Sequence, residues 1–378
     1  MPSWQWRAGC RAADSGVAQT VIQRPANLLL VTDSLGCGGS ERQMVDMADF
    51  WASRGARVTL ATWSGPSMPD FYAHGPGVAR VHLGPEGAGF LPQVRRVRTM
   101  RSLLRELRPD AVLSFLPRSN VPTLLAGLGL DVRIVVSERA HPRQDTSLTL
   151  PWRMLRRLSY ARADAVVSQT RTVAAWIHEH WGHAPCVIPN ALRVLPPPAG
   201  PRENVIVGVG RLVRQKGFDL LLEAFAGIAP VFPGWRLAIL GEGPERRRLA
   251  GQCAALGLAE RVQFPGRVRD AEQWMARAGL VVQPSRFEGF PNAVLEAMAM
   301  GAPVISADCL AGPADIIEDG RNGCLVPVED PDALARAMKR LLADAPLRQR
   351  LGNEAMSVRE RFRQESIMEK WQSTLIAA

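Results

Sequence analysis

The chain has 378 residues, of which 47% are apolar and 22% are charged. This composition is ordinary for a globular protein and excludes a disordered or fibrous chain, and the length predicts two domains. No apolar run reaches the about 18 residues of a membrane-spanning helix. Residues 1–25 lack the apolar core of a signal peptide, so we expect them to form a loose extension.

Basic charge is concentrated in the first half of the chain and is carried by arginine. The formal net charge is +10, and residues 1–190 hold 22 arginines against 14 acidic residues. Such a half predicts an anionic partner, such as a lipid headgroup, a membrane surface or nucleic acid. Solvated faces of an arginine-rich chain explain it equally well. The six cysteines are scattered without a C-x-x-C pair, which argues against a zinc site and fits a reducing, cytoplasmic compartment.

The first structural pattern is a buried strand followed by a glycine-rich turn. Residues 26–33 form a continuous apolar run, which is typical of a strand buried on both faces. Gly38 and Gly39 belong to the turn, and Ser40 has the side chain of a helix N-cap. A strand at residues 58–62 follows the helix. Strand, turn, helix and strand in this order predict a doubly wound α/β unit.

Polar side chains follow another predicted strand of this half. Residues 134–137 read as a buried strand, and Glu138, Arg139 and His141 come directly after it. In open α/β sheets, ligands bind at the carboxyl ends of the strands. We therefore expect these three side chains to line a ligand site.

Two further segments of this half combine arginines with apolar residues. Residues 91–107 have apolar residues near helical spacing and are rich in arginine, and residues 152–157 form a second basic cluster. A basic amphipathic helix can lie on an anionic membrane. The solvated faces of crossover helices are an equally good explanation for both segments.

A proline-rich linker separates this half from a second α/β pattern. Residues 190–204 predict a stiff hinge, and a strand is expected from residue 205. Arg211 and Lys216 lie in the loop after that strand, where two fixed cations can neutralise a diphosphate leaving group. Lys216 is one of only three lysines in the chain, which hints that a compact point charge is needed there. A solvated loop is the alternative.

The stretch from residue 286 to residue 304 holds two carboxylates, Glu288 and Glu296, around a loop that becomes a helix. Pro291 suits the first helical turn, because the amide hydrogen that it lacks would have no partner there. Free backbone N–H groups and the positive end of the helix dipole bind phosphate. Glu296 lies roughly 12 Å beyond Glu288 if the segment is helical throughout, so the carboxylates can meet both ends of a nucleotide sugar. A buried helix with a carboxylate N-cap explains the stretch equally well.

In combination, these motifs resemble the retaining glycosyltransferases of family 4, in particular the subgroup that builds bacterial surface and lipid-linked glycans. The resemblance covers residues 26–378. Its motifs are G-G-S-E-R from Gly38, S-E-R-A-H-P from Ser137, G-R-L-V-R-Q-K-G from Gly210, G-E-G-P from Gly241, S-R-F-E-G-F-P-N-A-V-L-E-A-M from Ser285 and D-G-R-N-G-C-L-V-P from Asp319. The family implies an α/β fold of the GT-B architecture, with two doubly wound Rossmann-like domains facing each other across a cleft.

The expected domain boundaries follow the linker. The chain is expected to divide into an extension at 1–25, an acceptor-side domain at 26–190, a hinge at 191–204, a nucleotide-sugar-binding domain at 205–355 and a terminal helix at 356–378. The resemblance implies that the terminal helix packs back on the first domain.

The resemblance implies a role for each residue at a matching position of the second domain. Arg211 and Lys216 would hold the donor diphosphate. Glu288 would face the hydroxyls of the donor sugar, and Glu296 those of the ribose. Arg267 is a candidate for the base pocket. The loop residues whose backbone would contact sugar and phosphate are Gly289, Phe290, Pro291, Asn292 and Ala293.

In the first domain, the resemblance implies that Gly38 and Gly39 let a loop close over the phosphates. Many family members place a histidine of this domain beside the reacting sugar carbon. Here the matching strand end carries Glu138 and Arg139, with His141 further on. The resemblance therefore leaves open which of the three contacts the reacting centre. No metal and no bound cofactor are expected, because the family uses basic side chains and a helix terminus in place of a cation.

The function implied is transfer of a hexose or N-acetylhexosamine from a nucleotide sugar, with UDP favoured, to a lipid-linked or polysaccharide acceptor. Surface-glycan synthesis, including that of lipopolysaccharide, and peripheral contact with the inner face of the cytoplasmic membrane are expected with it. One alternative is a nucleotide-sugar epimerase on the same fold, which would consume donor without an acceptor. Another is a non-catalytic basic protein that binds membranes or nucleic acid. Sparse aromatic residues, at 6%, count against binding of single-stranded nucleic acid.

Overall fold

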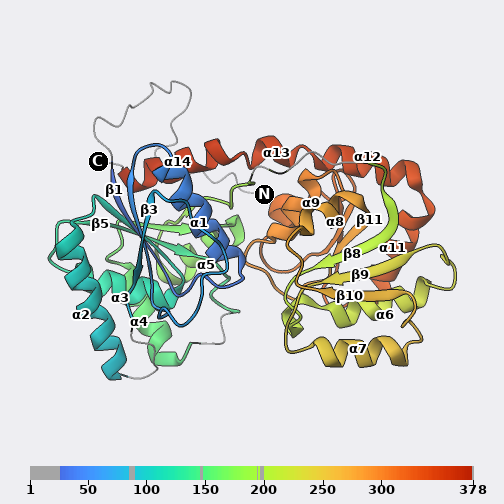
Figure 1. The fold of residues 1–378 in the computed structure, drawn as a ribbon, viewed down its shortest axis with the longest axis horizontal. Helices are drawn as coiled ribbons and strands as arrows, with labels where there is room; N and C mark the ends of the chain where they lie inside the picture. The colour runs from blue at the N-terminus through green and yellow to red at the C-terminus, as the bar shows by residue number, and fades with distance from the viewer. Residues whose placement is uncertain (1–25, 85–89, 145–147, 194, 196–199, 377–378) are drawn as a thin grey trace. The chain divides into compact units, whose positions relative to one another are not determined.

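The computed structural model describes residues 26–376 apart from 85–89, 145–147, 194 and 196–199. The chain forms two compact units (Figure 1). One unit runs to Ile188 and resumes at Met368, and the other comprises Pro189–Ile367. Each unit is built on its own sheet.

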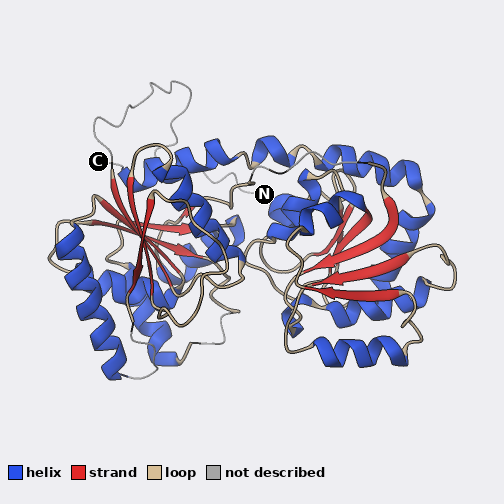
Figure 2. Ribbon diagram, viewed as in Figure 1, coloured by secondary structure: helices blue, strands red, loops and turns tan. Residues whose placement is uncertain are grey.

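The described residues of the first unit form a 7-stranded parallel sheet in the order β3-β2-β1-β4-β5-β6-β7. Its strands are β1 (Asn27–Thr32), β2 (Arg57–Thr62), β3 (Val78–His82), β4 (Ala111–Phe115), β5 (Arg133–Glu138), β6 (Ala165–Ser168) and β7 (Cys186–Val187). Its helices are α1 (Gly39–Ala52), α2 (Phe90–Leu107), α3 (Pro117–Gly127), α4 (Leu150–Tyr160) and α5 (Arg171–Trp181). β4 is buried along its whole length, because helices cover both faces of the sheet (Figure 2).

The order of this sheet reverses at β1. Leu30 pairs with Leu60 of β2 on one side and with Leu113 of β4 on the other. In open α/β sheets, such a reversal leaves a crevice at the carboxyl ends of the strands. Side chains that follow β1 and β4 are therefore placed where this unit can meet a ligand.

A charged network is buried between β5 and α4. Arg156 donates from Nε to Oε1 of Glu138 at 2.9 Å, and a second guanidinium N–H and the Tyr160 hydroxyl also reach this carboxylate. Asn120 in turn donates to the Tyr160 hydroxyl oxygen at 2.7 Å. Glu138 and Arg156 are each only 2% exposed. Each buried charge therefore has its counter-charge in contact, as the cost of desolvating ions requires.

The described residues of the second unit form a 6-stranded parallel sheet in the order β10-β9-β8-β11-β12-β13. Its strands are β8 (Glu203–Val209), β9 (Arg236–Leu240), β10 (Val262–Gly266), β11 (Ala278–Gln283), β12 (Val304–Ala307) and β13 (Cys324–Val326). Its longer helices are α6 (Phe218–Ile228), α7 (Arg246–Ala255), α8 (Ala271–Arg277), α9 (Asn292–Ala299), α11 (Pro331–Ala343) and α12 (Ala345–Ala355). Short helices lie at η1 (Arg214–Lys216), α10 (Pro313–Ile316) and α13 (Val358–Arg361). The last helix, α14 (Gln364–Ile376), begins in this unit and continues into the first, which resumes at Met368.

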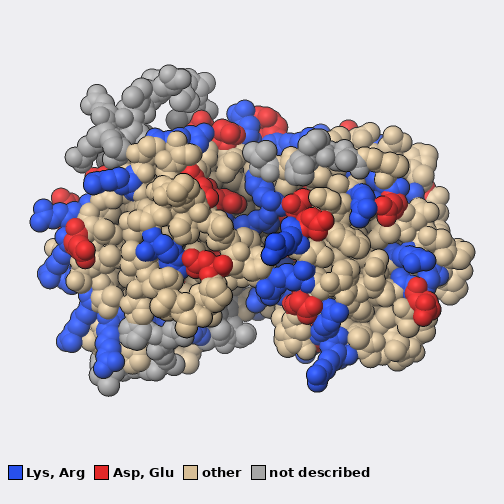
Figure 3. Space-filling model, viewed as in Figure 1, with Lys and Arg blue, Asp and Glu red and all other residues tan. Residues whose placement is uncertain are grey.

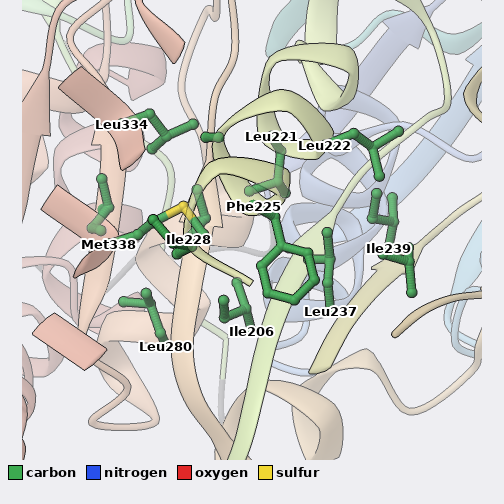
Figure 4. Close-up of a cluster of buried hydrophobic side chains, with 14 of the residues drawn as sticks. Ile206, Leu221, Leu222, Phe225, Ile228, Leu237, Ile239, Leu280, Leu334 and Met338 are labelled. Atoms are coloured by element: carbon green, nitrogen blue, oxygen red, sulfur yellow. The ribbon is translucent and has the colours of Figure 1, made fainter. Parts of the chain in front are cut away.

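One apolar cluster joins the sheet of this unit to the helices on one of its faces (Figure 4). Leu221, Phe225 and Ile228 recur at the three- and four-residue spacing of one helical face of α6. They meet Leu237 of β9 and Met338 of α11, and all five side chains are almost fully buried. Burial of each such side chain stabilises the fold by roughly 1.5–3 kcal/mol relative to leaving it exposed. Both units are thus doubly wound parallel α/β layers, which confirms the predicted fold class.

Three helix boundaries differ from the sequence-based prediction. Gly38 is the N-cap of α1, with extended backbone, and Ser40 already lies inside the helix. Pro291 is the N-cap of α9 and not part of its first turn. The predicted terminal helix at 356–378 is divided into α13 and α14, because Phe362 between them leaves helical geometry and is buried in the core. No described helix has the length and apolar character needed to cross a bilayer.

Arg156→Met tests the buried network of the first unit. The substitution leaves Glu138 buried without its counter-charge, so we expect a loss of about 3–5 kcal/mol in the free energy of unfolding. Hydrogen exchange of the β5 amides measures this for the first unit alone. The matched control is Arg157→Met, because Arg157 is exposed; it should change stability by at most about 0.5 kcal/mol. Equal effects of the two substitutions would contradict the assignment.

Candidate active site

The second unit brings two glycine-rich loops into backbone contact. Gly241 follows β9 with φ +138°, and a Cβ atom there would lie 1.9 Å from the carbonyl oxygen of Gly210. A Cβ atom at Gly243 would lie 2.3 Å from the carbonyl oxygen of Leu212. The amide of Leu212 also donates to the Glu242 carbonyl at 2.9 Å. The loops after β8 and β9 therefore form one surface, which only glycine at these positions permits.

An ion pair between Lys216 and Glu288 is the central contact of this edge of the sheet. Lys216 Nζ lies 2.6 Å from Glu288 Oε1, although the two residues are 72 positions apart. The aliphatic stem of Lys216 crosses Gly210, where a Cβ atom would lie 3.2 Å from two of its carbons. Ser285 Oγ donates to the same carboxylate oxygen at 2.7 Å, and Gln283 Nε2 donates at 3.3 Å. Glu288 is 6% exposed, so protein groups replace most of its water.

Arg286 fastens together the two loops that carry this ion pair. Its guanidinium makes a bidentate pair with Asp219, with both N···O distances at 2.9 Å. It also donates to the carbonyl oxygen of Arg214 and to Glu329 Oε1, each at 2.8 Å. Burial acts to raise the pKa of Asp219, but the hydrogen bonds and charge of Arg286 outweigh it, and the pKa is lowered. The positions of Lys216 and Glu288 therefore depend on this pair.

The loop before α9 presents backbone amides to an anion. The N–H groups of Gly289, Phe290 and Ala293 donate no hydrogen bond to a described residue. Pro291 caps the helix, whose positive dipole end adds to the attraction for negative charge. The Phe290 side chain is buried against Phe362, with ring centroids 5.8 Å apart, so it anchors the loop. Of this residue, only the backbone is left to contact a ligand.

The start of the second unit reaches the helix that carries Glu296. Arg193 Nε lies 3.4 Å from Glu296 Oε1, and Arg193 Nη2 donates to Glu272 at 3.1 Å. Asn190 donates to Oδ1 of Asn292 at 2.7 Å. The carboxylate assigned to the ribose hydroxyls thus already has a cationic partner. No local pattern predicts this contact, because the linker and the helix lie far apart in the chain.

Two predicted phosphate- and base-binding cations, Arg211 and Arg267, are more exposed than Lys216. Arg211 and Arg267 are exposed after β8 and β10, and Arg211 makes no ion pair with a described carboxylate. Their contact with a nucleotide stays a prediction.

Since α9 begins only at Asn292, the segment from Glu288 to Glu296 is not helical throughout. The separation of roughly 12 Å that assumed a helix therefore does not follow.

In the first unit, the glycine-rich turn is folded against a carboxylate of its own helix. The Gly38 amide donates to the Gly36 carbonyl at 2.9 Å, and Gly39 begins α1. A Cβ atom at Gly38 would lie 2.2 Å from Glu41 Oε2. Because that oxygen is the far end of a flexible side chain and the Gly38 backbone is extended, this contact does not by itself require glycine at Gly38. That the turn covers donor phosphates stays a prediction.

Of the three polar residues at the end of β5, Glu138 has a structural role. Its two carboxylate oxygens accept hydrogen bonds from Arg156 and Tyr160 inside the buried network. A carboxylate held in this way has little capacity left for a ligand. The expectation that Glu138 lines a ligand site is therefore corrected, and Arg156 of the predicted basic cluster is buried with it.

Arg139 is a buried cation at the same strand end. Its guanidinium carbon lies 4.1 Å from the ring centroid of Phe115, the last residue of β4. Burial lowers the pKa of Arg139 to about 9, while the charge of Glu41 acts in the opposite direction. Arg139 therefore keeps its charge at neutral pH, and its ring contact holds it beside the end of β4.

His141 is buried and neutral. Its Nδ1 accepts a hydrogen bond from the Arg143 amide at 3.2 Å, which leaves the proton of the neutral ring on Nε2. Burial first, and then the positive charges of Arg143 and His180, lower the pKa of His141. The ring packs edge-on against Trp176, with centroids 5.5 Å apart. At neutral pH His141 can thus donate one N–H but carries no charge.

Sequence reasoning missed two groups of residues at this edge. Gln283 and Ser285 both donate to Glu288, and their signal was available as polar residues at the end of an apolar strand. Asn190 and Arg193 carried no such signal. Among the described residues, no three histidine, cysteine or acidic side chains gather as the ligands of a metal ion would.

Asp219→Asn tests how Arg286 supports the loop of Lys216. The folded-state pKa of Asp219 lies below its ordinary value of 3.8, so its carboxylate stabilises the fold above that value. This contribution is lost as the pH falls through the lowered pKa. We expect faster hydrogen exchange at residues 214–217 in the variant at about pH 6, and convergence with the wild type in strong acid. Asp332→Asn, at an exposed position of α11, is the control. A difference that persists unchanged into acid would refute the assignment.

Comparison with known proteins matches both units to family models. A model described as Glycosyltransferase Family 4 matches residues 37–194, and one described as Glycosyl transferases group 1 matches residues 197–358. An exopolysaccharide phosphotransferase of Streptomyces coelicolor is 34% identical over 281 residues, which are 72% of this chain and 29% of that protein. The chain thus spans less than a third of that relative. An undecaprenol-linked-glycan N-acetyl-D-galactosaminyltransferase of Campylobacter jejuni is 27% identical over 278 residues, covering 72% of this chain and 76% of that protein.

Among solved structures, the Anabaena protein HepE, in complex with UDP and glucose, superposes with a TM-score of 0.77. The match covers 93% of this chain and 100% of HepE, at 20% sequence identity. At this identity the match shows only that the two proteins share a fold. The two family models together cover most of the chain and divide it as the two sheets do. The chain belongs to glycosyltransferase family 4.

Proposed function

We propose that the protein transfers a hexose or N-acetylhexosamine, with retention of configuration, from a UDP-sugar to a lipid-linked or polysaccharide acceptor in surface-glycan synthesis. The observation that carries the proposal is the ion pair of Lys216 with the buried Glu288, beside the backbone amides before α9 that donate no hydrogen bond to a described residue. It combines, in one unit, a cation and N–H groups for phosphate with a carboxylate for sugar hydroxyls.

Lys216 can serve both groups at once. Its ammonium has three N–H donors, and one is directed at Glu288, so others remain for a phosphate oxygen. A diphosphate carries more negative charge than one carboxylate and therefore draws part of the ammonium charge toward itself. Glu288 keeps its bonds from Ser285 and Gln283 and gains capacity to accept hydroxyl hydrogens of the sugar. Arg211, exposed on the neighbouring loop, supplies a second cation in this proposal.

The proposed chemistry follows from where charge develops. The bond between the anomeric carbon and the diphosphate oxygen breaks, which leaves negative charge on the phosphate and positive charge on the sugar ring. Lys216 and the amides before α9 stabilise the phosphate, because they are oriented before the reaction begins, and the exposed Arg211 adds a second positive charge. The acceptor oxygen forms its bond to the anomeric carbon from the side of the leaving group. Its proton passes to the departing phosphate oxygen, so the step balances without a protein base.

The choice of donor and acceptor is supported by what related proteins are named for. HepE was solved in complexes with UDP and with UDP-glucose, which supports a UDP-sugar donor. The Campylobacter jejuni relative is named for a glycan on diphospho-undecaprenol, and the Streptomyces coelicolor relative for exopolysaccharide. A further relative from Rhizobium meliloti is named a lipopolysaccharide core biosynthesis glycosyltransferase. Which sugar is transferred is best found with a panel of UDP- and GDP-sugars against a membrane extract.

The alternatives from the sequence predict different outcomes. An epimerase would convert a UDP-sugar in a reaction without acceptor, whereas a transferase releases UDP at a rate that depends on the acceptor. A non-catalytic basic protein would bind anionic surfaces with strong salt dependence and turn over no donor. The buried carboxylate beside Lys216 favours the transferase, because an anion-binding surface has no use for a desolvated negative charge.

We further propose that the first unit contacts an anionic membrane through α4, with α2 contributing charge. Leu150, Met154 and Leu158 recur every four residues on α4 and are 70%, 59% and 68% exposed. Exposed arginines at Arg153 and Arg157 flank this apolar stripe, as in interfacial helices. Two helices of one layer, α2 and α4, both pack on α3. Figure 3 shows basic side chains along the margin of this unit where α2 lies in Figure 1.

The arginines of α2 divide into two groups. Arg96 lies over the ring of Trp63, at 5.1 Å, and Arg101 donates to the carbonyl oxygens at the end of α3 at 2.7 Å. Arg95 and Arg98 are exposed and remain candidates for lipid headgroups. The sequence-based idea that the whole basic face meets the membrane therefore narrows to the exposed members.

Glu288→Gln tests the proposed function. The amide keeps the shape of the side chain but removes its charge, so the sugar loses a charged hydrogen-bond acceptor. We expect acceptor-dependent UDP release to fall by at least about 100-fold, with the circular dichroism spectrum unchanged. Glu354→Gln, on the exposed face of α12, is the matched control and should keep full activity. Unchanged turnover in Glu288→Gln would remove the role given to this residue.

Replacing Leu150, Met154 and Leu158 together by Asn tests the membrane surface. We expect the variant to lose sedimentation with vesicles that contain anionic lipid, because it loses the buried apolar area that binding requires. Val231, Leu256 and Val328, exposed apolar residues of the second unit, provide a control triple variant. Equal sedimentation of the wild type and both variants would exclude α4 as the contact.

A further inference from the structure

One acid at the carboxyl end of the first sheet is not used by the proposed donor chemistry. Asp33 directly follows β1, the strand at which the order of the sheet reverses. Ser119 lies in the first turn of α3, directly after β4, which pairs with β1. The two side chains thus meet at the topological switch point, where open α/β sheets bind ligands.

Only one oxygen of this carboxylate is satisfied by the protein. Ser119 Oγ donates to Asp33 Oδ1 at 2.5 Å, and Ser119 itself is fully buried. Asp33 Oδ2 accepts no hydrogen bond from a described residue, and the Asp33 side chain is partly exposed. The hydroxyl of Ser119 therefore fixes the orientation of the carboxylate, while its other oxygen stays open.

The arrangement is costly for the fold. Burial raises the pKa of Asp33, while the Ser119 hydrogen bond and the charges of Arg96 and Arg118 act in the opposite direction. Glu138, at the end of β5, shows how the same unit satisfies a structural acid, with a guanidinium and a phenol on its two oxygens. Asp33 has one hydroxyl in place of these donors. A partly desolvated carboxylate with spare acceptor capacity is the side chain expected where a hydroxyl ligand completes the set.

We propose that Asp33, oriented by Ser119, forms an acceptor subsite that binds a hydroxyl group of the glycan about to be extended. The inference deepens the proposed function and rests on it. Asp33 Oδ2 accepts the hydroxyl hydrogen, and the sugar replaces the water that the carboxylate gave up. Ser119 is a positioning residue, because it is too buried to touch the ligand. The donor residues Lys216 and Glu288 belong to the second unit, so the two roles can be separated by mutation.

The experiment compares steady-state kinetics of the wild type, Asp33→Asn and Ser119→Ala, with methyl hexosides and their deoxy analogues as acceptors. We expect Asp33→Asn to raise the acceptor KM by about 10- to 100-fold, as the loss of a charged hydrogen bond implies. Donor KM and acceptor-independent UDP release should stay within about twofold, because donor contacts are intact. Ser119→Ala should raise the acceptor KM less. One deoxy analogue should be poor for the wild type and no poorer for Asp33→Asn.

Asp164→Asn is the matched control. Asp164 lies directly before β6, at the amino ends of the strands of the same sheet, and its carboxylate accepts a hydrogen bond from the Ile134 amide at 2.7 Å. Transfer with an unchanged acceptor KM in Asp33→Asn overturns the subsite and leaves the proposed function standing. If the wild type turns over no nucleotide sugar, the proposed function fails, and saturation-transfer NMR with the same methyl hexosides then decides. Binding lost in Asp33→Asn supports the subsite, and equal or absent binding overturns it.

Discussion

The contact between Lys216 and Glu288 is the constraint on which the second unit's candidate site depends. It joins two loops that are 72 residues apart, and a buried carboxylate of this kind is stable only while its donors stay in place. Other residues at the carboxyl ends of these strands hold the donors of Glu288 in position. Gly210 gives the lysine stem room, Gly241 lets the next loop pack on Gly210, and Arg286 ties both loops to Asp219. A side chain at Gly241 would collide with the Gly210 carbonyl oxygen, and one at Gly210 would press on the stem of Lys216.

The two units use the same geometry for different purposes. In both, parallel strands end at one edge, and polar side chains gather there because the strands themselves are buried on both faces. In the second unit the acid and the cation neutralise each other in contact. In the first unit two acids at strand ends on either side of β4 differ in character: Glu138, at the end of β5, is satisfied by Arg156 and Tyr160, whereas Asp33, after β1, is held by one hydroxyl. The number of donors per carboxylate, and not burial alone, separates the structural acid from the candidate ligand-binding acid.

The sequence predicted what depends on local pattern and failed where a distant partner decides. Continuous apolar runs such as residues 26–33 predicted the buried strands, and the glycine motifs predicted both loops, because these follow from local patterning. Helix starts were wrong by one or two residues at Ser40 and Pro291, since which backbone amide is capped depends on the turn before it. Glu138 was assigned to a ligand site because nothing local reveals Arg156, which lies 18 residues on and reaches it only after folding.

The sequence also does not show which arginines of the first unit end up buried and which stay exposed. The net charge alone therefore does not predict how strongly this unit attracts an anionic surface. Arginines that look alike in the sequence end in different environments: Arg156 neutralises an internal acid, Arg101 caps a helix, and Arg95 is exposed. Only the exposed group adds to the field that an anionic surface meets, because a buried guanidinium paired with a carboxylate contributes a dipole that falls off quickly. In the proposed membrane contact, the electrostatic attraction would therefore come from the exposed arginines beside the apolar stripe of α4, and it would be weaker than the net charge of +10 alone would indicate. The exposed apolar stripe of α4 does not enter the net charge at all. It therefore supports the proposed membrane contact more strongly than the arginines do.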